Sequence, residues 1–127
     1  MDLQKIGDVI VDGGLGQKGR DLFIYQMPPD VTQGILVRGN YNGSPINWEM
    51  PEYFHDEFQI VIRAKTVDAG LRLADAVSAL LTISNRTIGG AMDVKFIRPR
   101  HKPVVFPRSD GSNVEFSINF DAVYGIM

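Results

Sequence analysis

The chain contains no cysteine among its 127 residues, which excludes disulfide bonds, thiol catalysis and zinc sites built on thiolates. It also lacks a strong charge of either sign, since 13 Lys and Arg residues stand against 15 Asp and Glu, for a net charge of −2. Proteins that grip nucleic acid usually carry a strongly basic balance, so that class is disfavoured. No apolar run approaches the roughly 18–20 residues of a membrane span, and we expect neither a membrane segment nor a signal peptide.

What is present fits a single globular domain over residues 1–127. A domain of this length buries roughly two-thirds of its unfolded surface, so it needs neither a metal nor a disulfide to fold. The apolar fraction of 44% and the charged fraction of 22% are ordinary for such a chain. The lack of cysteine suits a reducing cytoplasm.

Hydrophobic periodicity predicts two helices. Residues 2–12 carry apolar side chains at spacings of three and four, with Asp2 as a candidate N-cap; a short strand over residues 8–11 is the alternative. Residues 67–81 repeat the same spacing behind Thr66, which is a suitable N-cap. We expect this second helix to be the main one, packed on a sheet.

Alternating apolar and polar residues predict the strands of that sheet. The clearest is 57–64, in which Phe58, Ile60 and Ile62 share one face. Further strands are predicted over residues 21–27, 34–39, 46–50, 92–97, 104–106 and 114–120, and a loop over residues 85–90. The predicted fold class is α+β: a mostly antiparallel β-sheet with one main helix packed on it and a short N-terminal helix.

Glycines 14, 16 and 19 match the spacing G-x-G-x-x-G. A dinucleotide-binding fold needs a helix directly after these glycines, but residues 20–27 are aromatic and β-branched and end at two prolines. A Walker A loop also fails, because Lys18 is followed by glycine. We interpret the stretch as the end of the N-terminal helix and its link into the sheet.

Other chemical motifs are weak. His55, Asp56 and Glu57 are consecutive, and we interpret them as a solvated turn before a strand, since neighbouring strand residues point to opposite faces. His101 stands among basic residues and prolines and is interpreted as a surface residue. No nucleophile signature is present. The sequence predicts no catalytic, cofactor-binding or metal-binding residue, and we expect no enzyme and no cofactor.

Candidate protein-interface residues come from three segments. Large side chains in the Pro- and Gly-rich loop 41–53 either tuck onto the core or anchor a protein interface. The basic run 98–102 either contacts phosphates or an acidic protein partner, or is a solvated loop. The solvated loop is favoured. We expect the tip of the 107–113 hairpin to be exposed and mobile in the single subunit, and to become ordered when it contacts a partner. The candidates are Trp48, Met50, Tyr53, Arg98, Arg100, Arg108, Asp110 and Gly111.

Several segments together resemble phage tail terminators of the minor-capsid or tail-completion type. The most telling are FQIVIRAKTVDAGLRLADAVSALL (58–81) and EFSINFDAVY (115–124). Others, in order, are Gly-Leu-Gly at 14–16, Leu-Phe-Ile at 22–24, Gly-Ile-Leu-Val at 34–37 and Pro-Glu-Tyr-Phe at 51–54. Each is only moderately specific, but their order and spacing extend over most of the chain.

The resemblance implies a structural role in the virion. Such proteins form a ring, usually a homohexamer, that caps the head-proximal end of the tail tube, stops its polymerisation and joins head to tail. The implied partners are further copies of the chain, the tail tube protein and a head-completion or connector protein. DNA passes through the lumen without specific binding, and assembly takes place in the host cytoplasm. The alternatives are another neck protein, such as a stopper or connector, and a small nucleotide-binding enzyme.

Overall fold

The computed structural model of the chain describes residues 2–39, 53–90, 92–107 and 113–126. The elements in chain order are α1 (Leu3–Asp12), β1 (Leu22–Ile24), β2 (Gly34–Gly39), β3 (Tyr53–Ala64), α2 (Val67–Leu81), β4 (Ile83–Ile88), β5 (Met92–Pro99), β6 (Val104–Pro107) and β7 (Val114–Ile126). The strands form one seven-stranded, mostly antiparallel sheet. The predicted α+β class is confirmed.

Both helices begin at the predicted N-caps. The Asp2 carboxylate accepts a hydrogen bond from the backbone N–H of Gln4 at 3.0 Å, and the Thr66 hydroxyl oxygen accepts one from the N–H of Ala69 at 3.2 Å. Each bond satisfies a donor that the first turn of a helix leaves free. The alternative strand over residues 8–11 is therefore wrong.

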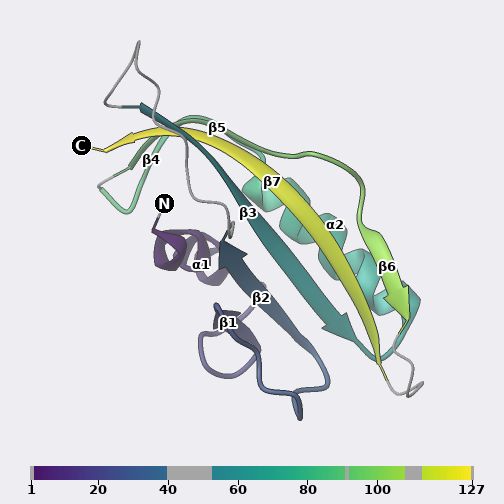
Figure 1. Cartoon of the computed structure of the whole chain (residues 1–127). Coiled ribbons are helices and arrows are strands. Elements are labelled where there is room, and N and C mark those ends of the chain that lie inside the picture. Colours follow the sequence, from purple (N-terminus) through teal and green to yellow (C-terminus); the bar gives the residue numbers. More distant parts are fainter. Residues whose placement is uncertain (1, 40–52, 91, 108–112, 127) are drawn as a thin grey trace.

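A long antiparallel ribbon of β3 and β7 forms the centre of the sheet (Figure 1). It pairs twelve residues on each strand, from Tyr53 opposite Gly125 to Ala64 opposite Val114. The strand order is β1-β2-β3-β7-β5-β4. On its other side β7 pairs with β6 along residues 114–117 and with β5 along residues 120–126. As a result β6 lies at one end of the ribbon, and β4 and α1 lie at the other end.

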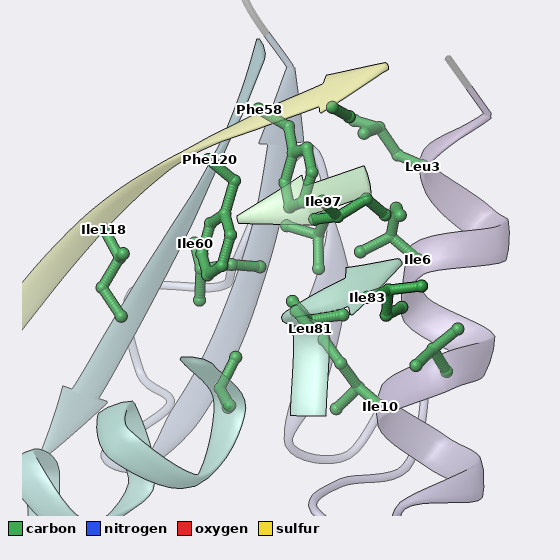
Figure 2. Close-up of a cluster of buried hydrophobic side chains, with 14 of the residues drawn as sticks. Leu3, Ile6, Ile10, Phe58, Ile60, Leu81, Ile83, Ile97, Ile118 and Phe120 are labelled. Carbon is green, nitrogen blue, oxygen red and sulfur yellow. The ribbon is translucent and has the colours of Figure 1, made fainter. Parts of the chain in front are cut away.

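Alternate residues of β3 and β7 face the helices and form the core (Figure 2). The predicted face of Phe58, Ile60 and Ile62 is buried, as are Phe116, Ile118 and Phe120 of β7. The rings of Phe58 and Phe120 stack with their centroids 5.0 Å apart. Ile6 and Ile10 of α1 and Leu81 of α2 close the core from the helix side.

Helix α2 approaches the sheet closely at Gly70. A Cβ atom at this position would lie 2.0 Å from the ring of Phe116, which is fully buried. The absence of a side chain at this point therefore sets the spacing between helix and sheet. Val67, the first residue of the helix and part of its predicted apolar spacing, is exposed.

Three other expectations need correction. Residues 85–90, predicted as a loop, belong largely to β4. His55, Asp56 and Glu57 form no turn but lie within β3, where they pair with β7. The predicted strand 21–27 shortens to β1. The predicted strand 46–50 lies outside the described residues.

Candidate assembly surfaces

Contacts with Asp8 and Asp21 hold the glycine stretch, residues 13–19, in place. Gly14 and Gly19 take positive φ values of 76° and 83°, which glycine adopts without strain. The N–H of Gln17 donates to the Asp21 carboxylate at 2.6 Å, and the Lys18 ammonium lies 2.7 Å from the Asp8 carboxylate. The stretch runs from α1 into β1, as interpreted, and no helix follows it before β2.

The same stretch forms backbone hydrogen bonds with the outer edge of β1 at Leu22. The N–H of Leu22 donates to the carbonyl of Gln17 at 3.1 Å, and the N–H of Gly19 donates to the carbonyl of Leu22 at 2.9 Å. Within the described ranges, β1, β4 and β6 are the outer strands of the sheet, and β1 is the one whose outer edge bonds to its own chain at Leu22. Open strand edges are templates for pairing with another chain.

Strand β6 carries exposed apolar side chains, which we call the β6 patch: Val104, Val105 and Phe106, with 42%, 39% and 53% of their surface exposed. Contiguous exposed apolar residues mark interaction sites. The sequence predicts the strand but not its exposure. The available signal was a run of three apolar residues between Pro103 and Pro107, without the alternation of a half-buried strand.

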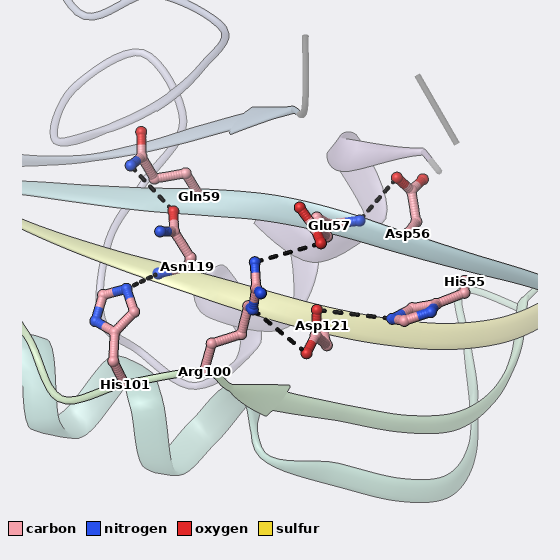
Figure 3. A network of polar contacts seen from close by, with 8 residues as sticks. All are labelled: His55, Asp56, Glu57, Gln59, Arg100, His101, Asn119 and Asp121. Carbon is pink, nitrogen blue, oxygen red and sulfur yellow. Dashed lines mark hydrogen bonds and ion pairs between the residues drawn. The ribbon is translucent and has the colours of Figure 1, made fainter. Parts of the chain in front are cut away.

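The two candidate arginines of the basic run, Arg98 and Arg100, make contacts with other side chains, and Figure 3 shows those of Arg100 on the open face of the sheet, the face without helices. The Arg100 guanidinium lies 3.3 Å from the Glu57 carboxylate and 3.6 Å from the Asp121 carboxylate. The Arg98 guanidinium lies over the ring of Phe96 at 4.5 Å. We conclude that neither side chain is simply solvated, although both remain reachable by a partner.

His101 fastens the segment before β6 to β7. Its Nε2 accepts a hydrogen bond from the N–H of Asn119 at 3.2 Å (Figure 3), and the N–H of Arg100 donates to the carbonyl of Asn119 at 2.8 Å. His101 is half-buried rather than a plain surface residue. The path of the chain into β6 is thereby fixed.

Arg63 pins the loop between β1 and β2 onto the open face. Its guanidinium donates to the carbonyls of Pro28 and Val31 at 3.0 and 2.8 Å and to the Glu115 carboxylate at 3.4 Å. Only 9% of this side chain is exposed. It forms part of the wall of a depression of about 420 Å³ that extends to Phe106. The Nη donors of this buried guanidinium meet acceptors, whereas its Nε–H has no hydrogen-bond partner among the described residues.

A second hollow, which we call the α1–β4 cleft, has a volume of about 300 Å³ at the other end of the ribbon. Its walls are Asp8, Val9, Val11 and Asp12 of α1 with Arg86, Thr87, Ile88 and Gly89 of the β4 side. Val9 and Ile88 are buried and Val11 is half-buried. The cleft therefore combines an apolar floor with a charged rim.

Tyr53 lies on the sheet as the first residue of β3. Its hydroxyl donates to the Asp93 carboxylate at 3.3 Å, and the Lys95 ammonium lies 3.2 Å from Asp93 and 5.3 Å from the tyrosine ring centre. The hydrogen bonds with Asp93 and Tyr53 raise the pKa of Lys95. The other candidates, Trp48, Met50, Arg108, Asp110 and Gly111, lie outside the described residues and stay predictions.

The buried phenol of Tyr124 donates to the Asp56 carboxylate at 3.3 Å. Burial, followed by the negative charge of Asp56, raises the pKa of Tyr124 to about 12. Because this folded value lies above the unfolded value, the neutral phenol stabilises the fold fully below about pH 10, and the contribution is lost between about pH 10 and pH 12.

Replacing Tyr124 by phenylalanine tests this pH dependence. We expect the wild-type free energy of unfolding to fall more steeply than that of Tyr124→Phe as the pH rises through this window, measured by urea denaturation. The titration of the remaining tyrosines and lysines is common to both proteins and cancels in the difference. Parallel curves for the two proteins would contradict the buried, neutral phenol.

The described residues offer little for other kinds of site. Among the described residues, no group of three His, Asp or Glu side chains could hold a metal ion. No helix in the same part of the chain is long and apolar enough to cross a membrane. The surfaces that remain are the edge strands and the hollows beside them.

Comparison with known proteins identifies the chain. No curated protein sequence matches it. Its fold is similar to that of a chain in the virion of a native gene transfer agent (GTA) particle, with a TM-score of 0.62 and 13% identity, covering 97% of this chain and 90% of the other. The family described as "Bacteriophage tail terminator protein" matches residues 9–126. The resemblance is thus confirmed: the chain belongs to the bacteriophage tail terminator family and is a structural protein of the virion tail.

Proposed function

We propose that the protein forms a ring, most simply a homohexamer, that caps the head-proximal end of the tail tube. The ring stops tube polymerisation and offers its other face to a head-completion or connector protein. Family membership supports the place of the protein in the tail.

The observation that carries the proposal is the pair of different open surfaces at the two ends of the β3–β7 ribbon. A closed ring is built from heterologous contacts, in which one patch meets a different patch on the next copy. The β6 patch and the α1–β4 cleft are such a pair, while the edge of β1 is occupied by its own chain.

The charge of the chain suits a ring whose lumen passes DNA. Binding to the phosphate backbone grows with the number of Lys and Arg side chains that contact it. A subunit of net charge −2, whose Arg100 is neutralised by Glu57 and Asp121, favours passage over retention.

The test is a tube-growth assay with the tail tube protein of the same phage. We expect tubes mixed with this protein to carry a ring at one end in electron micrographs and to stop growing there, and native mass spectrometry to give one closed oligomer. Tubes incubated without it are the control and continue to grow. Unchanged growth with bare tube ends would overturn the proposal; binding to a connector but not to tubes would place the protein among the other neck proteins.

A further inference from the structure

We propose that, in the ring, the β6 patch of one copy inserts into the α1–β4 cleft of the next copy. This inference rests on the proposed ring and names the residues that close it. It commits to a second copy of this chain as the occupant of both surfaces.

The apolar surfaces of the two partners match. In the β6 patch the exposed side chains of Val104 and Phe106 share one face of the outer strand, and that of Val105 lies on the opposite face. The cleft, with a volume of about 300 Å³, offers Val9, Val11 and Ile88. A phenyl ring that moves from water onto such a floor contributes favourable free energy to association.

The cleft also offers a backbone partner. One of its walls is β4, the second outer strand of the sheet. A short strand that enters beside β4 adds main-chain hydrogen bonds to the contact of its side chains, which is the usual way in which an extended segment docks on an open sheet edge. Strand β6, four residues long, is such a segment.

The charges beside the two surfaces are complementary. Lys102 precedes β6 and Asp12 lies on the helical wall of the cleft; both are exposed, and neither has an ion-pair partner within the described ranges. The opposite wall carries the cation Arg86. This arrangement favours entry of β6 with Lys102 on the α1 side and disfavours the reverse orientation.

The placement of the surfaces favours a head-to-tail contact between copies over a two-fold dimer. Strands β6 and β4 lie at opposite ends of the β3–β7 ribbon (Figure 1), and the cleft is on the β4 side, so each copy uses both ends and the contact repeats from copy to copy. A patch-to-patch dimer would instead bring the two Lys102 side chains near each other, and like charges across an interface are unfavourable.

Cysteine pairs test the contact directly, because the chain has no cysteine of its own. We expect the double variant Val11→Cys/Phe106→Cys, oxidised after assembly, to give a covalent ladder that ends at the size of the ring. A mixture of the two single variants should give dimers only, and each single variant alone should stay monomeric on a non-reducing gel. The matched control Val11→Cys/Tyr25→Cys uses the exposed Tyr25 away from β6 and should give no ladder.

Charge reversal tests the predicted orientation. We expect Lys102→Glu and Asp12→Lys each to raise the protein concentration needed for half-assembly by roughly tenfold, and the double variant to recover most of that loss. Arg72→Glu, on the exposed face of α2, is the control and should assemble normally. Circular dichroism confirms that each variant folds.

The outcomes separate this inference from the proposed function. Rings that cap tubes but give no disulfide between positions 11 and 106, or tolerate charge reversal, would overturn the β6–cleft contact and leave the ring standing. Disulfide dimers of Phe106→Cys alone would overturn it in favour of a two-fold contact. Absence of any ring, both in solution and on tube ends, would overturn the proposed function itself.

Discussion

Replacing Phe120 by alanine is expected to lower the free energy of unfolding by about 3–5 kcal/mol. Phe120 is fully buried at the middle of the β3–β7 ribbon, and its ring stacks on Phe58 at 5.0 Å. Removing it exposes apolar surface, leaves a cavity beside Ile97 and Ile60 (Figure 2), and ends the ring contact. Urea denaturation followed by circular dichroism measures the change.

The matched control is Phe106→Ala, which removes the same side chain from an exposed site on β6. We expect it to change the free energy of unfolding by less than about 0.5 kcal/mol. Both measurements belong at protein concentrations below assembly, because association would add to apparent stability. Equal losses at the two positions would show that β6 is buried within the single subunit.

Replacing Arg63 by alanine is expected to cost about 2–4 kcal/mol of stability. The substitution removes the guanidinium donor from the carbonyls of Pro28 and Val31 and removes the partner of Glu115. It also releases the loop between β1 and β2 from the sheet. We therefore expect faster amide hydrogen exchange at Val31, whose N–H now donates to the carbonyl of Pro28 at 3.2 Å.

Two variants make this prediction specific. Arg98→Ala removes an exposed arginine that stacks on Phe96 and should cost less than about 1 kcal/mol. Arg63→Met keeps the apolar length of the side chain but not its donors, so it should accelerate exchange at Val31 as Arg63→Ala does. Unchanged exchange in both Arg63 variants would show that the guanidinium does not hold the loop.

The helices could be predicted because their signals are local. Asp2 and Thr66 cap the two starts, and the apolar spacing behind each fits one buried face. The central strands were identified for a similar reason, since Phe58 and Phe120 each lie in an alternating run. Their pairing, by contrast, joins segments far apart in the chain and could not be predicted from either segment alone.

Other elements could not be predicted because their signal comes from a neighbour. Strand β4 has four consecutive exposed polar residues between Ile83 and Ile88, a composition typical of a loop, and it is held as a strand by β5. His55 and Glu57 belong to β3 because β7 continues as far as Gly125 beside them. Polar residues of an edge or open face carry no hydrophobic period to detect.

The candidate surfaces were only partly predictable. Arg98 and Arg100 were identified from the basic run, but the partners of Arg100, Glu57 and Asp121, come from strands far away in the chain. The β6 patch was predicted as strand without its exposure. Whether an apolar strand is covered depends on which layer packs over it, and that is a property of the whole fold.

The central position of β7 has a consequence for the order of folding. It is synthesised after every strand that it pairs with, β3, β5 and β6. Until it emerges from the ribosome, one edge of β3 has no strand beside it, and the nascent chain lacks core side chains such as Phe116, Ile118 and Phe120. Contacts of such long sequence separation form slowly. We therefore expect a subunit competent for assembly to appear only after β7 is translated, which prevents incomplete chains from joining a ring.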